Sequence, residues 1–435
     1  MQDANNYRRA TSENVFYLYC LLLFFLSTLL LPFISYCQTD TTKHDTAGFH
    51  QQDLKDWLAR RKSKPAKPAK GNFLLVIPYI SSNPTAGFMI GGGLTYTFKT
   101  KKTDEHVSLI SSNVSYSTNK LVNVNMKSNV FMLNEKLVLN GDWRFLVNSE
   151  STFGLGTVGP NTSSIDINGT PTSTDSMEQP LKYHQLRFYE VGSWRLISNF
   201  FAGIGFQYDR YYNIQDDVLE KGDTATSQHY QYSLRHDFNP KEYTVSGFSL
   251  NFLYDSRDNQ VNAYKGLYAN INYRINLESM GSTHNSTMLL TEYRGFFALD
   301  APRYRHILGF WLYGKFTPSG NAPYLALPAL GYDQQQRTGR GYRYGRFRGE
   351  DMLYGESEYR FPISPNTGIL GGVVFFNATT TSDRANNVQL LDKWRAGYGG
   401  GLRVMLDKAS RTRLSVEAGL SPGSFGFYLA ALETF

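Results

Sequence analysis

The chain has 435 residues, of which 41% are hydrophobic, 15% aromatic and 19% charged, and its formal net charge is +7. A mean hydropathy of −0.38 excludes a bundle of apolar transmembrane helices, because only one apolar run approaches the roughly 18–20 residues that span a bilayer. Thirty Tyr, 29 Phe and 38 Gly favour strands, because aromatic side chains suit strands and glycine weakens helices. The composition therefore predicts an all-β chain.

The N-terminal residues 1–37 have the pattern of a secretory signal peptide. Two arginines precede an apolar run from Val15 to Leu31, and Ser35 and Cys37 stand two apart, as small residues before a cleavage site do. Two alternatives stay open, an uncleaved membrane anchor and a lipidated Cys37. Both cysteines of the chain, Cys20 and Cys37, lie in this segment. The exported part is therefore expected to contain neither a disulfide framework nor a thiolate metal site.

Residues 38–70 are predicted to be a polar periplasmic linker. A short helix is expected from Asp53 to Arg61, and the Lys-Pro-Ala repeats of residues 64–70 are typical of a stiff, solvated linker. This stretch is too short for a folded domain. We therefore expect residues 71–435 to form one domain.

Residues 71–435 alternate between apolar and polar side chains with period two. At 267–277, for example, Ile271 and Tyr273 alternate with Asn270 and Asn272. In a strand this alternation places one face in an apolar medium and the other in a polar one. The alternating segments run for about 10–14 residues, longer than the usual five or six. Export, strand length and polar inner faces together predict a transmembrane antiparallel β-barrel.

The alternation marks sixteen candidate strands, an even number, as bacterial barrels require. They are 72–80, 86–99, 106–117, 120–132, 136–149, 182–195, 198–210, 243–255, 265–277, 286–299, 305–317, 351–362, 368–378, 394–406, 411–420 and 424–435. If the N-terminus is periplasmic, the longest connections, at 150–181, 211–242 and 318–350, face outward and the periplasmic turns are short. This asymmetry is typical of outer-membrane barrels.

The stretch from Thr338 to Ile363, TGRGYRYGRFRGEDMLYGESEYRFPI, resembles the sixth outer loop and following strand of the BamA/TamA (bacterial surface antigen) superfamily. Members carry an Arg-Gly-Phe/Tyr tip on this loop, and the next strand ends in Glu-x-Arg-Phe-Pro or a similar sequence. The tip residues here are Arg340, Gly341 and Tyr342, and the strand-end residues are Glu358, Arg360, Phe361 and Pro362. The resemblance covers roughly residues 71–435.

The resemblance implies that the long sixth loop folds into the lumen and that Arg340 pairs with Glu358 on the wall. Alternation places Glu356, Glu358 and Arg360 together on the lumen face of the strand 351–362. The alternative is that these carboxylates are simply solvated. The chain departs from the family where the next strand often has Phe-x-Asp-x-Gly, because it reads Phe376-Asn377-Ala378-Thr379 there and lacks the carboxylate.

Two further matches support the resemblance. Asp255, Arg257 and Asp258, followed by Gly266, resemble the family's periplasmic turn between its eighth and ninth strands. The chain ends on Phe435, and a C-terminal aromatic residue is the usual recognition signal of outer-membrane barrels. Family members carry periplasmic POTRA domains before the barrel, and residues 38–70 cannot contain one, so we expect a member without them.

Pro78 lies in the first candidate strand. Proline cannot donate to a ladder and belongs at an edge or a seam. In the family, a weak seam between the first and last strands is thought to admit client strands. The other interpretation is that Pro78 ends a short strand.

The sequence contains no catalytic or metal-binding pattern, so we expect no enzyme, no metal and no cofactor. Eight histidines are scattered, and none stands at metal-ligand spacing from another. His229 and His236 fall in the outer connection 211–242 together with several aspartates, where a solvated loop is expected rather than a metal site.

Three functions remain open for a protein of the Gram-negative outer membrane. The family resemblance implies assembly, insertion or translocation of outer-membrane proteins, with client proteins or periplasmic chaperones as partners. The polar inner faces allow a passive or substrate-selective channel. The connections 150–181 and 211–242 allow a surface interaction barrel. The +7 charge favours lipopolysaccharide or anionic lipid, and nothing in the sequence indicates nucleic acid.

Overall fold

The computed structural model places residues Phe49–Phe435 in one compact unit. It describes residues 51–60, 72–83, 87–100, 107–157, 164–165, 171–172, 178–300, 306–334, 337–408, 410–430 and 433–435. The signal peptide expected at 1–37 lies outside these ranges and stays a prediction. No helix within them is long and apolar enough to cross a membrane.

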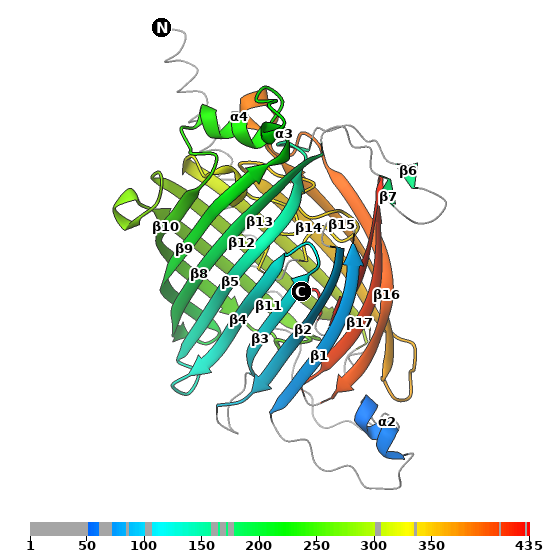
Figure 1. Cartoon of the computed structure of the whole chain (residues 1–435). Coiled ribbons are helices and arrows are strands. Elements are labelled where there is room, and N and C mark those ends of the chain that lie inside the picture. The colour runs from blue at the N-terminus through cyan, green and yellow to red at the C-terminus, as the bar shows by residue number, and fades with distance from the viewer. Residues whose placement is uncertain are drawn as a thin grey trace. The chain divides into compact units, whose positions relative to one another are not determined.

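Sixteen antiparallel strands form one curved sheet, which confirms the predicted fold class and strand number (Figure 1). In sheet order the strands are β1 (Phe73–Asn83), β2 (Gly87–Phe98), β3 (Ser108–Ser117), β4 (Val122–Met132), β5 (Leu137–Thr152), β8 (Gln179–Ile197), β9 (Phe200–Asp216), β10 (Tyr243–Asp255), β11 (Gly266–Asn276), β12 (Ser286–Ala298), β13 (Ile307–Gly320), β14 (Met352–Pro362), β15 (Leu370–Thr381), β16 (Arg395–Asp407), β17 (Thr412–Ser421) and β18 (Ser424–Ala430). Outside the sheet, β6 (Ser164–Ile165) pairs with β7 (Pro171–Thr172).

The sheet has two edges, β1 and β18, and no ladder joins them in the part of the chain that the structure describes. Pro78 lies inside β1 opposite Gly92 of β2, and β1 continues past it to Asn83. The interpretation that Pro78 ends a short strand was therefore wrong. An edge strand tolerates proline, because the missing N–H faces away from the paired neighbour.

The two faces of the sheet differ in chemistry, as the period-two pattern predicts. On β10, Phe248, Leu250 and Phe252 are exposed on the outer face, whereas Ser249 and Asn251 are buried on the inner face. The same alternation runs around the sheet. The apolar outer face is suited to contact with lipid. The polar and charged side chains of the same strands point to the inner face and fill the interior.

The chain end differs from the prediction of a strand over 424–435. The last strand stops at Ala430, and Phe435 is buried on the inner side, where its ring packs on Trp311 and Phe296. Its carbonyl oxygen accepts a hydrogen bond from Arg360 Nη2 at 3.1 Å. Burial of the Phe435 ring and the hydrogen bond to its carbonyl oxygen stabilise the inward turn of the chain end. A longer last strand would instead extend an unpaired edge of the sheet.

The long connections lie at one end of the strands. The connection between β9 and β10 carries α3 (Asp217–Glu220) and α4 (Gln228–Arg235), whose His229 is fully buried. Tyr232 of α4 packs on Tyr324 of η3 (Tyr324–Ala326), in the connection between β13 and β14. This part of the connection is therefore a packed core, not the solvated loop that we expected, because its aromatic residues bury each other.

At the opposite end, where the turns are short, α2 (Leu54–Arg60) forms where the sequence predicted a helix. Asp56 forms an ion pair with Lys408, with Nζ and Oδ2 2.8 Å apart. The backbone N–H of Gln52 donates to Thr367 O at 2.9 Å. These contacts hold the segment before the barrel against two of the short turns. The remaining short helices are η2 (Glu278–Met280) and η4 (Arg384–Asn386).

Candidate functional site

The connection of residues 321–351, between β13 and β14, turns back so that its tip meets the inner face of the sheet. The tip is Arg340, Gly341 and Tyr342. Gly341 has φ +103°, and a Cβ here would lie 2.9 Å from Leu420 O. Only glycine combines this backbone conformation with such a close approach to β17. The loop tip therefore depends on a glycine at this position.

The Arg340 guanidinium contacts three carboxylates from two strands. Its Nη2 lies 2.5 Å from Glu356 Oε1 and 2.7 Å from Glu358 Oε2, both on β14. Its Nη1 lies 2.5 Å from Glu417 Oε2 on β17. The side chain is 1% exposed, and its guanidinium lies over the Phe375 ring at 3.6 Å. A planar group with five donors suits this arrangement, because it can serve several carboxylates at once.

Backbone contacts hold the tip as well. The Asn377 side chain donates to Arg340 O at 2.9 Å, and the Gly341 N–H donates to the Tyr428 hydroxyl at 2.8 Å. The Ser421 hydroxyl donates to Gly341 O at 2.9 Å. These partners lie on β15, β18 and β17. With the ion pairs to β14 and the Tyr342 hydroxyl, which donates to Ala396 O on β16, the loop tip is fixed to all of the last five strands of the sheet.

The charged contacts extend beyond the tip. Glu358 Oε1 accepts from Arg360 Nε at 2.7 Å and lies 2.5 Å from Arg403 Nη2. Arg403 also pairs with Glu417 at 3.2 Å and with Glu433 at 2.5 Å. We call the group the clamp. Its members are Arg340, Arg360, Arg403, Glu356, Glu358, Glu417 and Glu433. Three cations therefore face four carboxylates, all of them buried.

The structure brings together the tip and wall residues that the sequence singled out. Arg340 meets Glu358, as the resemblance implied, and it meets Glu356 as well. Sequence reasoning missed Glu417, which supplies a third carboxylate to Arg340. Asn377, in the stretch without the expected carboxylate, binds the loop backbone. Glu417 stood on the polar side of an alternating strand, but alternation alone could not single it out.

Arg403 and Glu433 were also missed. Glu433 had been placed in the last strand, and it reaches Arg403 only because the chain end turns inward. Tyr342, the third tip residue, donates its hydroxyl to Ala396 O at 2.8 Å. Phe435, which the sequence singled out as the C-terminal aromatic residue, lies beside the clamp, because its carbonyl oxygen accepts a hydrogen bond from Arg360.

The turn predicted from Asp255 to Gly266 is built as a compact cap on β10 and β11. Arg257 donates to both carboxylate oxygens of Asp255 at 2.9 and 2.8 Å, and Asp258 accepts from the backbone N–H of Tyr264. Gly266 has φ +103°, and a Cβ there would lie 2.3 Å from Ser256 O. Asp258 also pairs with Arg411 in the turn before β17, at 2.7 Å. The turn thus links β10–β11 to β16–β17.

A sixteen-stranded antiparallel sheet with an apolar outer face and charged side chains inside defines an outer-membrane β-barrel. The model of the Omp85 superfamily domain matches residues 147–415, more than half of the chain. The chain belongs to the Omp85 superfamily and is a protein of the Gram-negative outer membrane.

Three solved structures are similar to this chain at low sequence identity. CdiB from Escherichia coli is 11% identical, with a TM-score of 0.50, over 85% of this chain and 62% of that one. CdiB from Acinetobacter baumannii is 13% identical, with a TM-score of 0.48, over 81% and 58%. BamA from Haemophilus ducreyi lacking POTRA domains 1–3 is 14% identical, with a TM-score of 0.49, over 84% and 69%. The chain thus spans less than two thirds of either CdiB chain. No curated protein sequence matches.

Proposed function

We propose that this barrel acts in the assembly, insertion or translocation of proteins at the outer membrane. Membership of the Omp85 superfamily supports this role. The observation that carries it is the clamp, in which one loop arginine bridges three buried carboxylates on two strands. The proposed partners are client outer-membrane proteins or periplasmic chaperones, together with outer-membrane lipid and lipopolysaccharide.

In this proposal the clamp fixes loop 321–351 inside the barrel and ties it to the strands beside the open edge. Tyr428, which receives the Gly341 N–H, lies on β18, the edge strand itself. Glu433, two residues before the C-terminus, pairs with Arg403 in the same group. The same group of contacts therefore holds both the loop 321–351 and the residues at the open edge of the sheet. A barrel that handles client strands at its edge would use such contacts to keep the edge in one arrangement.

The experiment is quantitative outer-membrane proteomics after depletion of this protein. Rescue is attempted with the wild type, with Arg340→Ala, and with Arg384→Ala, whose ion pair to Asp351 is half exposed and lies outside the clamp. We expect depletion to lower the levels of other barrels, and wild type and Arg384→Ala to restore them. Arg340→Ala should fail to restore them even when it reaches the membrane at normal level. An unchanged proteome after depletion would overturn the proposal.

A further inference from the structure

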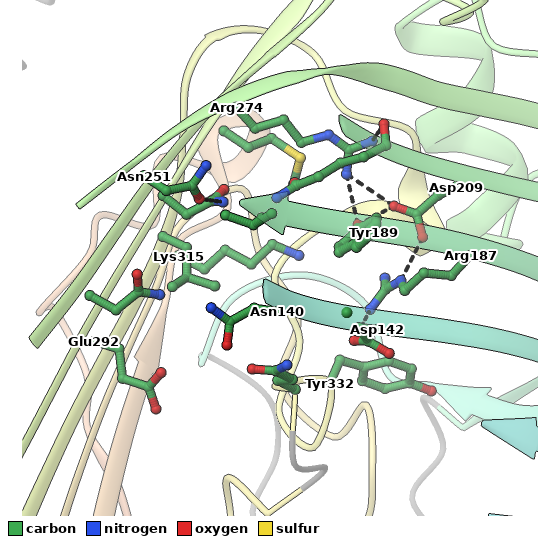
Figure 2. A pocket seen from close by; sticks show the side chains of 18 of the residues that line it. Asn140, Asp142, Arg187, Tyr189, Asp209, Asn251, Arg274, Glu292, Lys315 and Tyr332 are labelled. Carbon is green, nitrogen blue, oxygen red and sulfur yellow. Dashed lines mark hydrogen bonds and ion pairs between the residues drawn. The ribbon is translucent and has the colours of Figure 1, made fainter. Parts of the chain in front are cut away.

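A cavity of about 160 Å³ lies on the inner face of the barrel, away from the clamp (Figure 2). Its wall comes from β5 and β8 to β13, and Tyr332 of loop 321–351 closes one side. No clamp residue is among those that line it. Arg187, Arg274 and Lys315 supply its cationic side chains. The cavity is therefore a separate feature of the inner face with its own charges.

One carboxylate of the lining serves two arginines. Asp209 Oδ1 accepts from Arg187 Nε at 2.7 Å, and Asp209 Oδ2 lies 3.0 Å from Arg274 Nη1. The Tyr189 hydroxyl also donates to Asp209, and both guanidinium groups lie over the Tyr189 ring. Figure 2 shows this group along one side of the cavity. A single negative charge is thus divided between two cations.

The other two carboxylates of the lining are engaged by arginines of their own. Asp142 accepts two hydrogen bonds from Arg144, at 2.7 and 2.6 Å. Glu292 accepts from Arg294 at 2.8 and 2.6 Å and from the Trp311 indole at 2.8 Å. Asp142 Oδ2 also lies 3.7 Å from Arg187 Nη1, so Arg187 lies between Asp142 and Asp209.

Lys315 is the lining cation that forms no ion pair with any described residue. Among the described residues, no carboxylate lies within ion-pair distance of its ammonium, whose one hydrogen bond is to Ala326 O at 3.4 Å. Figure 2 shows this side chain reaching into the space between the labelled groups. The nearby Asn140 amide makes no hydrogen bond to any described residue and can also donate. The lining holds three cations and three carboxylates, and Arg144 and Arg294, which lie outside the lining and pair with two of those carboxylates, add two positive charges beside the cavity.

We propose that this cavity binds a small anionic solute through a phosphate or carboxylate group, with Lys315 as the principal contact. Excess positive charge in a confined space attracts an anion, and charge-assisted hydrogen bonds hold it. Asn140 and Arg187 supply further donors. A cavity of roughly 150 Å³ holds benzene, so the solute has the size of a small ring or a short chain. This inference does not rest on the proposed role in assembly.

The test is isothermal titration calorimetry on the full chain in detergent micelles, with inorganic phosphate and succinate as probes and glucose as the uncharged control. We expect saturable binding of at least one anion and none of glucose. Lys315→Met should weaken anion binding by about tenfold or more, and Lys315→Arg should keep most of it. Lys182→Met is the matched control, because Lys182 is half exposed and lies outside the cavity.

A second variant keeps the proposal testable if Lys315→Met does not fold. Asn140→Asp places a carboxylate in the lining and leaves Lys315 in place, so it should weaken anion binding by a similar factor. Stronger binding of phosphate than of succinate, or the reverse, identifies the group that the cavity prefers. Absence of saturable anion binding to the wild type would overturn the proposal, as would equal affinity in the wild type and in both cavity variants.

Discussion

The clamp and the cavity both consist of ion pairs between arginines and carboxylates, but the two groups differ in their balance of charge and in what they hold. Both are built from buried arginines and carboxylates on the inner face. In the clamp, three arginines meet four carboxylates, and Arg340 comes from a loop, so the contacts join distant parts of the chain. Around the cavity, five cations meet three carboxylates when the partners Arg144 and Arg294 outside the lining are included. Each pair lies within one strand or joins strands at most two places apart in the sheet. An excess of negative charge holds a cationic loop, whereas an excess of positive charge leaves room for a mobile anion.

This difference determines what each group should do when it is broken. A clamp that joins a loop to the wall should release the loop when one partner is lost. Loss of one partner among the ion pairs around the cavity should disturb only the neighbouring strands and leave the loop 321–351 in place. The following variants separate these outcomes.

Replacing Arg340 by alanine should have the largest effect. Glu356, Glu358 and Glu417 would lose their shared partner while still buried, and breaking a buried ion pair costs about 3–5 kcal/mol. We expect a lower urea midpoint in micelles and rapid proteolysis within 321–351. Arg384→Ala, which removes a half-exposed pair, should change the midpoint little. A loop that stays protease-resistant in Arg340→Ala would contradict the clamp.

Gly341→Ala should have the next largest effect. A Cβ at this position meets Leu420 O at 2.9 Å in a backbone conformation that disfavours side chains. Strain and overpacking together should cost about 2–3 kcal/mol and loosen the tip. Gly281→Ala is the control, because Gly281 has φ +88° but no atom lies within 4 Å of the point that a Cβ would occupy. Equal urea midpoints for the two variants would show that the approach to β17 does not constrain the loop.

The sheet could be predicted from the sequence because each strand carries its own period-two signal. The sixteen segments match the strands to within a few residues, with two exceptions. β9 continues past residue 210 to Asp216, and the chain end turns inward at Glu433 and Phe435. That turn depends on Arg360, Arg403 and Trp311, which lie on other strands. Contacts between strands far apart in sequence leave no local pattern.

The sites divide in the same way. Arg340 and Glu358 could be singled out because they belong to a motif within one stretch of chain. Glu417 could not, since it reaches Arg340 only through the curvature of the sheet. Lys315 and Arg274 of the cavity likewise lie on separate strands, and nothing in the alternation shows which inner-face cations form no ion pair.

Asp209→Asn tests the cavity wall with a smaller expected effect. Arg187 and Arg274 would lose their shared carboxylate, but both line the cavity and can be hydrated there, so we expect a cost of about 1–2 kcal/mol. Proteolysis of loop 321–351 should stay at the wild-type rate. Phosphate or succinate should bind severalfold more tightly, because a negative charge beside the cavity is gone. Release of the loop in this variant would mean that the two groups are not independent.

The smallest effect concerns His229 in the long connection between β9 and β10. Burial lowers the pKa of its imidazole to about 4, although Asp216 lies 3.8 Å away, so the folded loop holds it neutral at pH 7. An unfolded histidine titrates near pH 6.5, so the stability that the neutral ring contributes is complete above that pH and is lost as pH falls towards 4.

We therefore expect the packing of α4 on Tyr243 and Tyr324 to weaken by roughly 1 kcal/mol between pH 7.5 and 6. Hydrogen exchange of residues 228–235, compared at the two pH values after correction for the intrinsic rate, measures this change. His229→Gln should remove the pH dependence, since glutamine does not titrate, whereas the clamp variants should keep it. The same pH dependence in His229→Gln would assign the effect to another group.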